Sequence, residues 1–376
     1  MLDLAREYKY MKADIDRAIH RCLTHQKWIL GPEVGEFEEK CAQYLSVKHC
    51  IGVSSGTDAL IISLRALAIH LTGKEYFSRE HKIITTPFTF TATGSAILRG
   101  GATPVFVDID PQTFNIDPQA IEAYLKTKPK NVAGIIPVHL YGQACDMDKI
   151  LSIARRHKLA VIEDTAQAFG GEWKGRRLGG LGDFGAFSFF PSKNLGGFGD
   201  GGMIATNNNT FAQTARMLAK HGGKDKYNAD HIGYNARLDT LQAGILLAKM
   251  RYLDQFNNKR RIIARTYQSH LKKITGLILP KTSTDGRHIF HQYTIRVTRS
   301  QRNSLQEYLK SKGVDTMIYY PVALHKMKIF IKNCLLGSAL STTEKACDEV
   351  LSLPTEPLMT KQEIREIARH IKDGLK

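Results

Sequence analysis

The sequence lacks several features that define specialised classes of protein. No stretch approaches the roughly 18 apolar residues of a membrane-spanning helix. The first residues, MLDLAREYKYMKAD, show no basic segment leading into an apolar one, so we expect neither a secretory signal nor a membrane anchor. The cysteines are scattered, with no C-x-x-C pair, which predicts reduced, buried thiols in a cytoplasmic protein and no metal site. They are Cys22, Cys41, Cys50, Cys145, Cys334 and Cys347.

Acidic residues are outnumbered, because 36 Asp and Glu face 53 Lys and Arg, for a formal net charge of +17. Such an excess can indicate nucleic-acid binding. The basic residues are spread along the chain, however, with neither a helix-turn-helix nor a basic tail. The densest basic group, NKRRIIAR at 258–265, has helical spacing and indicates a solvated helix face. We therefore expect a lysine-rich surface suited to anionic metabolites, and no nucleic-acid partner.

The first two thirds of the chain alternate short β-rich runs with helical patterns. Helices are expected at 57–68, in a segment ending at residue 98, and at 146–157. This alternation predicts an α/β fold with a mainly parallel, seven-stranded sheet covered by helices. The seven expected strands are 50–55, 82–87, 103–109, 132–138, 159–164, 185–190 and 202–207.

The pattern changes near residue 238. Apolar residues at helical spacing predict one long amphipathic helix over about 237–271. After it we expect a strand at 290–297, a helix at 301–312, a short strand near 314–320 and a closing helix at 360–374. The 376 residues suit a large domain plus a small one. We predict a large domain over 1–245 and a smaller C-terminal α/β domain over 246–376.

Two glycine patterns fit G-x-G-x-x-G, at Gly180, Gly182 and Gly185 and again at Gly197, Gly199 and Gly202. A dinucleotide-binding fingerprint follows a strand and opens a helix. Both patterns here lead into expected strands, so they indicate tight turns or close approach to a flat ligand.

The stretch SSGTDAL (54–60) fits phosphate binding better, because it ends a strand and opens a helix. Backbone N–H groups around Gly56, Thr57 and Asp58 would face an anion. A plain helix N-cap explains the same residues, and the sequence leaves both interpretations open.

Two further motifs carry candidate chemistry. In EDTAQAFG (163–170), Asp164 ends an apolar strand and Gln167 lies three residues later, although a surface acid pair is the alternative. In FSFFPSKNLGGFGDGG (187–202), Lys193 has no acid near it in sequence, and apolar surroundings can make a lysine amine nucleophilic. A phosphate cradle, a buried acid and such a lysine are what pyridoxal phosphate requires. Phe90 could stack on the cofactor ring or simply pack in the core.

Taken in order, SGTDAL, TPFTFTATGSAI, VHLYGQACDMD, IEDTAQAFG, FSFFPSKNLGGFGDGG and GYNARLDTLQAG resemble the DegT/DnrJ/EryC1/StrS family, from about residue 25 to 325. Its members are pyridoxal-phosphate-dependent nucleotide-sugar aminotransferases of the aspartate-aminotransferase fold (PLP fold type I). The resemblance implies a homodimer with shared active sites, glutamate as amino donor and pyridoxamine phosphate in the half-reaction. Because relatives with histidine in place of Lys193 act as dehydratases, the lysine favours transamination.

The resemblance also implies a role for each motif residue. Lys193 would bond the cofactor and move the proton, and Asp164 would hold the ring nitrogen. Gln167 would contact the ring's hydroxyl side, and Phe90 would stack on the ring. The phosphate would be bound by Gly56, Thr57, Asp58 and Ser188, with Asn235 reaching it from the neighbouring subunit.

The stretches at 28–39, 140–148 and 315–326 look most like the branch that aminates C3 of 3-keto sugars. Members that take a 3-keto glucuronate often have His-Tyr-Pro where this chain has Tyr319, Tyr320 and Pro321, which weakens a uronate substrate without excluding it. We favour a UDP-linked 2-acetamido-2-deoxy-3-keto sugar, with a dTDP-linked 6-deoxyhexose as another alternative. The expected substrate-binding residues are Arg237, Tyr319, Tyr320 and His325, although His325 could instead pack at the domain junction.

Overall fold

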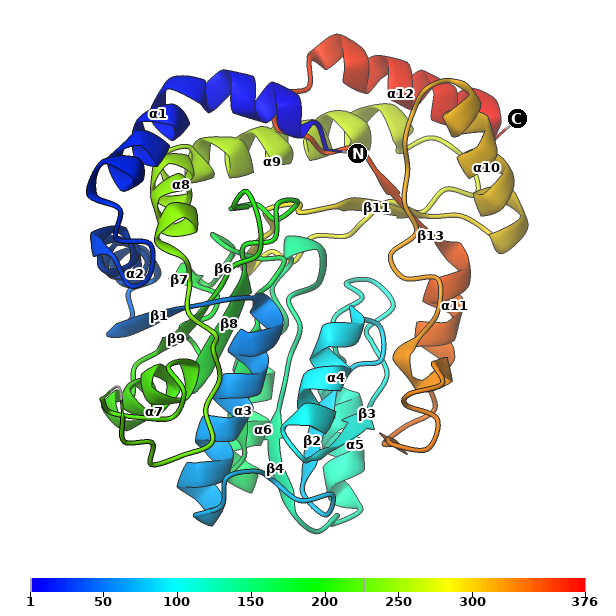
Figure 1. Cartoon of the computed structure of the whole chain (residues 1–376). Helices are drawn as coiled ribbons and strands as arrows, with labels where there is room; N and C mark the ends of the chain where they lie inside the picture. The colour runs from blue at the N-terminus through cyan, green and yellow to red at the C-terminus, as the bar shows by residue number, and fades with distance from the viewer. Residues whose placement is uncertain (1, 226, 376) are drawn as a thin grey trace.

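A computed structural model, which describes residues 2–225 and 227–375, has one large sheet at its centre (Figure 1). The order is β1-β9-β8-β5-β4-β2-β3-β12, and only β9 runs antiparallel to its neighbours. The seven predicted strands are confirmed, and the two-residue β12 (Leu335–Leu336) adds an eighth. The seven are β1 (His49–Val53), β2 (Lys82–Thr85), β3 (Thr103–Phe106), β4 (Val132–Ile135), β5 (Ala160–Asp164), β8 (Phe184–Ser188) and β9 (Gly202–Thr206).

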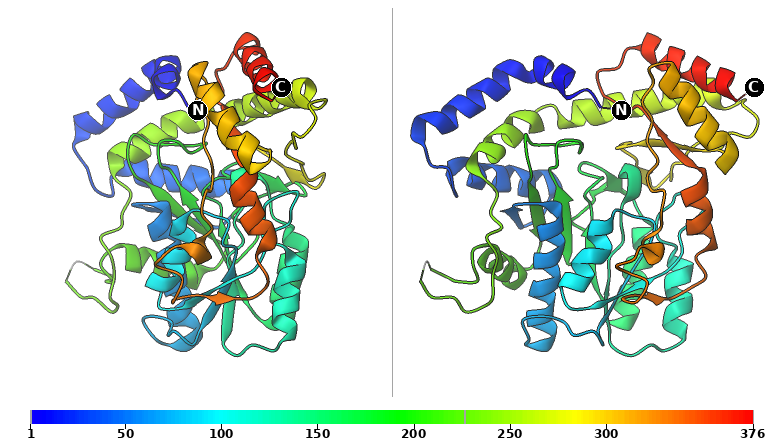
Figure 2. Two further views of the ribbon diagram at one scale, coloured as in Figure 1. Left: turned by 90° about the vertical axis from the view of Figure 1, so that its right-hand side faces the viewer. Right: turned by 45° about the vertical axis from the view of Figure 1, so that its right-hand side comes forward.

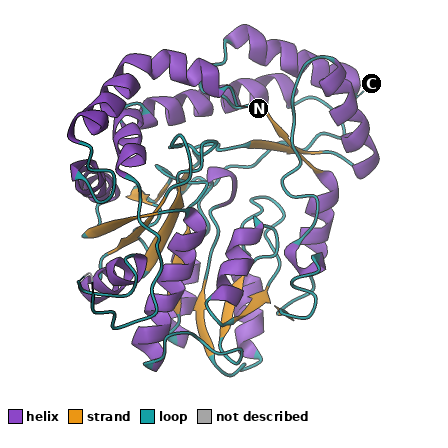
Figure 3. Cartoon of the chain, viewed as in Figure 1, coloured by secondary structure: helices purple, strands orange, loops and turns teal. Residues whose placement is uncertain are grey.

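Helices cover both faces of this sheet, as Figure 3 shows. Side chains alternate along each strand, so Ile83 and Ile162 pack in the cluster around α3 and α7, while Ile84 and Val161 pack in the cluster around α5 and α6. The covering helices are α2 (Pro32–Leu45), α3 (Gly56–Thr72), α4 (Thr91–Arg99), α5 (Pro118–Lys126), α6 (Met147–His157), α7 (Asn209–Ala219) and α8 (Thr240–Met250).

The C-terminal part forms a smaller α/β layer beside the large sheet (Figure 2). A separate apolar cluster joins α9 (Leu253–Leu271), α10 (Arg299–Ser311) and α12 (Lys361–Gly374) to the β11–β13 ribbon. The predicted boundary at residue 245 falls inside α8, and the division into two domains stays a prediction. The remaining elements are α1 (Leu4–His25), β6 (Glu172–Trp173), β7 (Arg176–Arg177), β10 (Gly286–Arg287), β11 (Tyr293–Arg296), α11 (Ser341–Glu349), β13 (Val350–Leu353) and the 3₁₀ turns Leu140–Gly142 and Leu324–Lys326.

Three sequence expectations are corrected. The long helix over 237–271 is two helices, because the chain turns between α8, which packs on α1 and α2, and α9, which packs on α12. Residues 314–320 form no strand, only a single bridge from Met317 to Ser352. The basic group at 258–265 is not wholly solvated, because Arg260 is buried and donates to the Thr355 carbonyl over 2.7 Å.

Other expectations hold. Both glycine patterns lead into strands, β8 and β9. The cysteines are all free, five of them buried and Cys334 partly so. None of the helices among the described residues combines the length and the hydropathy that crossing a bilayer demands.

Candidate active site

The candidate site lies where several parallel strands end. β1, β2, β4, β5 and β8 all run in the same direction, so their carboxyl ends share one edge of the sheet. Open α/β sheets bind ligands at this edge. A cavity of about 420 Å³ opens there, and the residues after these strands supply most of its lining. Gly56, Thr57, Phe90, Asp164, Gln167, Ser188, Lys193, Tyr319 and Tyr320 all line it.

The N-terminus of α3 forms one wall of the cavity. Ser55 caps the helix, because its Oγ accepts a hydrogen bond from the Asp58 amide over 3.0 Å. The first amides of any helix lack intrahelical acceptors, so those at Gly56 and Thr57 are available to an anion. Gly56 lies so close to β8 that a Cβ there would be 2.7 Å from the Ser188 Cβ.

Asp164 is buried at the end of β5. Its Oδ2 accepts from Thr93 Oγ1 over 2.8 Å, and its Oδ1 accepts from the Ala166 amide over 3.2 Å. Burial raises the pKa of Asp164 above its usual value, although both hydrogen bonds and the charge of Lys193 oppose this. The carboxylate makes no ion pair within the part of the chain that the structure describes. A cation brought into the cavity would therefore stabilise the ionised form.

Lys193 faces the same cavity from the loop after β8. Burial lowers the pKa of its amine to about 8, and the carboxylate of Asp164 opposes the shift. Within the described residues, Nζ has no hydrogen-bond partner. An amine with this pKa has a much larger unprotonated fraction near neutral pH than an ordinary lysine, so it can act as a nucleophile or as a base.

Gln167 and Tyr320 are joined across the cavity. The Gln167 side chain accepts from the Tyr141 amide over 2.8 Å and donates to the Tyr320 hydroxyl over 2.9 Å. Phe90 is the N-cap residue of α4 and is 57% exposed, with its ring centroid 6.4 Å from that of Tyr320. A large aromatic ring exposed at a cavity wall is available for stacking against a flat ligand.

Four of the predicted site residues do not line this cavity. The carboxylate of Asp58 accepts from the hydroxyls of Ser54 and Ser55 over 2.6 and 2.8 Å. Asn235 accepts a hydrogen bond from Arg237, which lines a different hollow of about 720 Å³ beside α7. His325 pairs instead with Glu344, over 3.1 Å.

Sequence reasoning missed several residues that do line the cavity. Thr93 lies one helical turn after Phe90, so the spacing could have placed the two on one face once α4 was identified. His291 comes from the C-terminal part of the chain, and no local pattern links it to Lys193. The other missed lining residues include Thr89, Phe190, Ser192, Asp200 and Gln292.

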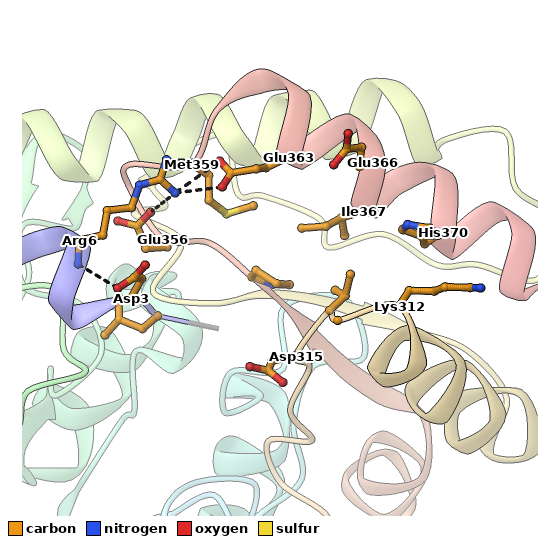
Figure 4. A pocket seen from close by; sticks show the side chains of 14 residues that line it. Asp3, Arg6, Lys312, Asp315, Glu356, Met359, Glu363, Glu366, Ile367 and His370 are labelled. Carbon is orange, nitrogen blue, oxygen red and sulfur yellow. Dashed lines mark hydrogen bonds and ion pairs between the residues drawn. The ribbon is translucent and has the colours of Figure 1, made fainter.

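A second cavity, of about 440 Å³, lies between the start of α1 and α12 (Figure 4). Its charged side chains largely satisfy one another. Arg6 lies 3.0 Å from Glu363 and 3.8 Å from Glu356. Thr360 and Glu363 cap the N-terminus of α12 beside it, and its lysine, Lys312, is exposed, so it offers less chemistry than the Lys193 cavity.

Cys22, His25 and Glu33 place their possible ligand atoms within 4.8 Å of one another, the spacing of a metal site. The His25 ring is already committed, because Nδ1 accepts from the Lys27 amide over 3.0 Å. Nε2 then carries the hydrogen and donates to Glu33 over 3.1 Å, which leaves no ring nitrogen free to bind a metal. The cluster is explained by its own hydrogen bonds.

Comparisons with known proteins agree over nearly the whole chain. The profile of the DegT/DnrJ/EryC1/StrS aminotransferase family matches residues 9–372. A protein of Geobacillus stearothermophilus named pleiotropic regulatory protein is 44% identical, covering 99% of this chain and 97% of its own. A UDP-2-acetamido-2-deoxy-3-oxo-D-glucuronate aminotransferase of Pseudomonas aeruginosa is 40% identical, covering 97% of each. A UDP-N-acetyl-3-dehydro-alpha-D-glucosamine 3-aminotransferase of Acidithiobacillus ferrooxidans is 39% identical, covering 100% of this chain and 97% of its own.

Solved structures show the same fold. An aminotransferase of this family from Brucella abortus superposes with a TM-score of 0.93 at 34% identity, covering 99% of this chain and 98% of its own. The protein ntda of Bacillus subtilis, solved with bound cofactor PMP, gives a TM-score of 0.86 at 35% identity, covering 96% of this chain and 82% of its own. These matches agree with the predicted aspartate-aminotransferase fold.

Proposed function

Because this chain belongs to the DegT/DnrJ/EryC1/StrS aminotransferase family, we propose that it transfers the amino group of L-glutamate to C3 of a nucleotide-linked 3-keto sugar. Membership makes the chain a pyridoxal-phosphate-dependent aminotransferase. The substrate that we favour is UDP-2-acetamido-2-deoxy-3-keto-glucopyranose. Its product would be a diamino sugar for lipid A, O-antigen or another cell-surface glycan, made in the cytoplasm.

One observation carries this proposal: a partly buried lysine of lowered pKa shares a cavity with a buried carboxylate that lacks an ion-pair partner among the described residues. These groups fit pyridoxal phosphate. Asp164 would hold the proton on the ring nitrogen, while Gln167 and Phe90 would contact the ring's hydroxyl side and face. The amides of Gly56 and Thr57 and the Ser188 hydroxyl would bind the phosphate.

Bound pyridoxal phosphate supplies an electron-withdrawing ring next to the carbon that carries the amino group. Lys193 does the proton chemistry beside it. Its Nζ would take the proton from the substrate carbon and deliver it to C4′ of the cofactor, and would reverse the transfer in the second half-reaction. Tyr320, held by Gln167, would contact the sugar and help to close the cavity around it.

The close packing at Gly56 predicts a loss of cofactor affinity in Gly56→Ala. The added Cβ would lie 2.7 Å from the Ser188 Cβ and would push the start of α3 away from β8. Crowding of this kind costs about 1–3 kcal/mol, so we expect a dissociation constant raised about tenfold, measured by titrating apo-protein with pyridoxal phosphate. Gly35→Ala is the matched control, because its Cβ would meet nothing within 4 Å. Equal affinities for both variants would contradict the proposal that the N-terminus of α3 binds the cofactor phosphate.

Each active site is proposed to lie between two copies of the chain. The support is that Asn235 and Arg237 contact each other outside the Lys193 cavity of their own chain. Mixing Lys193→Ala with Asn235→Ala would then create dimers with one intact site. Random pairing predicts recovery of about a quarter of wild-type activity. A mixture no more active than its two components would argue that each chain works alone.

The two UDP-sugar relatives differ at C6 of the sugar, where one substrate carries a carboxylate, and they are almost equally similar to this chain. Among the described residues, Lys193 is the only lysine or arginine lining the cavity, and Tyr319 offers one hydroxyl. Within a single chain this favours a sugar without a carboxylate, and Arg237 from the second copy is the proposed site residue that could still supply a cation. The test is a mass-spectrometric screen of 3-keto nucleotide sugars, UDP- and dTDP-linked, with 4-keto sugars as controls and glutamate present. Amination of the glucuronate alone, or of 4-keto sugars alone, would contradict the proposed substrate.

The name of the Geobacillus stearothermophilus relative motivates a second candidate, a regulator with this fold that performs no catalysis. The net charge of +17 would then serve a nucleic acid. DNA affinity that falls steeply with salt, together with no amination of any sugar in the screen, would favour that alternative.

A further inference from the structure

Arg65, in α3, is a fully buried arginine whose side-chain partners all lie outside its own helix. Its Nη2 donates to Glu75 Oε2 over 2.6 Å and to the Ile232 carbonyl over 2.9 Å. Its Nη1 donates to the Tyr234 hydroxyl over 2.9 Å, and its Nε donates to the Glu75 carbonyl. Burying a cation without such bonds is costly, and no apolar side chain could make them. Arg65 therefore connects α3 to residue 75 and to the segment 232–234.

Glu75 completes the attachment of that segment. Its Oε2 accepts from the Ile232 amide over 3.3 Å, and its Oε1 lies 2.5 Å from Nδ1 of His231. Burial alone would raise the pKa of Glu75, but the hydrogen bond from His231 and the charges of His231 and Arg65 outweigh it and hold that pKa below its usual value. Both backbone polar groups of Ile232 are therefore held by the Arg65–Glu75 pair.

The segment held in this way carries exposed side chains. The chain between α7 and α8 runs beside α3 (Figure 1), and within it Ile232 is 61% exposed and Asn235 is exposed as well. The Tyr234 amide donates to the Leu218 carbonyl over 2.7 Å, so α7 holds the same segment from its other side. Asn235 is thus fixed at the surface of the molecule, outside the Lys193 cavity of its own chain.

A role in the chain's own cavity is the alternative, because α3 also begins at the proposed phosphate site. Arg65 lies nine residues after Gly56, about 13 Å along the helix axis. The first turn of α3 is fixed by other contacts, namely the Ser55 cap and the packing of Gly56 on Ser188. The side chain of Arg65 makes its hydrogen bonds to Glu75, Ile232 and Tyr234 instead. The contacts therefore favour an effect on the segment 231–235.

We propose that Arg65 is a positioning residue that acts across the dimer, holding the segment 231–235 so that Asn235 is placed for the cofactor phosphate in the neighbouring copy of the chain. The site that depends on Arg65 is then the site of the other chain. This inference rests on the proposed function, because Asn235 serves the other chain only if the two copies share their sites.

The test is to find which of the two sites responds to Arg65→Lys. Lysine keeps the positive charge but lacks the planar fork of donors, so it cannot reach Glu75, Ile232 and Tyr234 together. Two hybrid dimers, purified through two different affinity tags, carry the same substitutions in different arrangements. The first hybrid has Lys193→Ala in one chain and Arg65→Lys in the other. The second has both substitutions in one chain and none in the other.

Each hybrid keeps a single Lys193, and only the site around it is measured. The apo-hybrid is titrated with pyridoxal phosphate, borohydride then fixes the bound cofactor to Lys193, and the modified peptide is quantified by mass spectrometry. In the first hybrid a chain with native Arg65 supplies Asn235 to that site, so we expect the affinity of a reference dimer of Lys193→Ala with wild type. In the second hybrid we expect a dissociation constant raised about tenfold. Weaker binding in the first hybrid alone would place Arg65 in its own chain's site and overturn the proposal.

A second readout needs no cofactor. In the apo-homodimer of Arg65→Lys, the amides of residues 231–235 are expected to exchange their hydrogens about tenfold faster than in wild type, whereas those of residues 60–64 in α3 keep their rate. Arg265→Lys, at an exposed position in α9, is the matched control and is expected to change neither. Faster exchange confined to α3 would contradict the proposal. If Arg65→Lys does not fold, Tyr234→Phe replaces it in the hybrids, with an expected effect of about threefold because one hydrogen bond is lost.

The outcomes separate this inference from the proposed function. A hybrid of Lys193→Ala with Asn235→Ala that binds the cofactor as weakly as the Asn235→Ala homodimer overturns the shared site, and this inference with it. If that hybrid binds as the reference dimer does, while the two Arg65→Lys hybrids bind equally, the shared site stands and the positioning role of Arg65 is overturned.

Discussion

Replacing Lys193 with alanine is expected to abolish amino transfer, with kcat lowered about a thousandfold or more. General acid–base catalysis alone contributes about 10²–10⁴-fold, and Lys193 is also proposed to bond the cofactor. No second lysine lines the cavity among the described residues, so nothing nearby could replace its amine. The measurement is release of 2-oxoglutarate from glutamate, with the aminated sugar followed by mass spectrometry.

Matched variants separate the effect of losing the proton-transferring amine from the effect of losing its positive charge. Lys193→Arg keeps a positive charge but cannot release a proton, so it is expected to be as inactive as the alanine variant. Added methylamine is expected to restore part of the activity of Lys193→Ala, because a small amine can enter the vacated space and move the proton. Lys126→Ala, at an exposed position in α5, controls for loss of a surface charge. A Lys193→Ala enzyme with near wild-type turnover would contradict the mechanism.

Much of the fold and part of the site could be predicted because the signals are local. Buried parallel strands are short apolar runs, and all seven were placed within a few residues. The ends of parallel strands meet at one edge of a sheet. The motifs containing Gly56, Asp164 and Lys193 could therefore be expected in one cavity, although the first and the last are more than 130 residues apart in the chain.

The remaining features depend on distant contacts. Two residues of β12 become a strand only because they pair with β3, and no propensity could indicate that. The helical spacing of apolar residues over 237–271 continues without a break across the turn between α8 and α9. The sequence pattern therefore gives no sign that the segment is two helices. Arg260 belongs to a basic segment whose composition is typical of a solvated helix face, but its side chain donates a hydrogen bond to the Thr355 carbonyl. The His291 ring is held at the cavity by a series of side-chain hydrogen bonds through Asn194 and Asn257, and such long-range contacts leave no pattern in the sequence.

Asp164→Asn is expected to lower kcat about a hundredfold and to weaken cofactor binding. Asn has nearly the same shape but no charge, so it could not hold a proton on the ring nitrogen. The loss of one preorganised electrostatic contact at a reacting centre is worth about 10²–10³-fold. The side-chain NH₂ group of the asparagine would also face either the Thr93 hydroxyl or the Ala166 backbone amide. Both of these groups donate to the carboxylate oxygens of Asp164 in the wild-type structure. Steady-state kinetics and a cofactor titration measure the two effects.

Thr93→Val provides the matched control for that charge, because it removes the hydrogen bond from Thr93 and leaves the carboxylate. This bond favours the ionised form, so its loss raises the pKa of Asp164 further. As the pH is lowered, Thr93→Val is therefore expected to lose activity at a higher pH than wild type does. In alkaline solution its activity is expected to approach that of wild type. Asp164→Asn has no carboxylate to titrate and is expected to stay slow at every pH. If the two variants had the same pH profile, the shape of the side chain rather than its charge would be what the site requires.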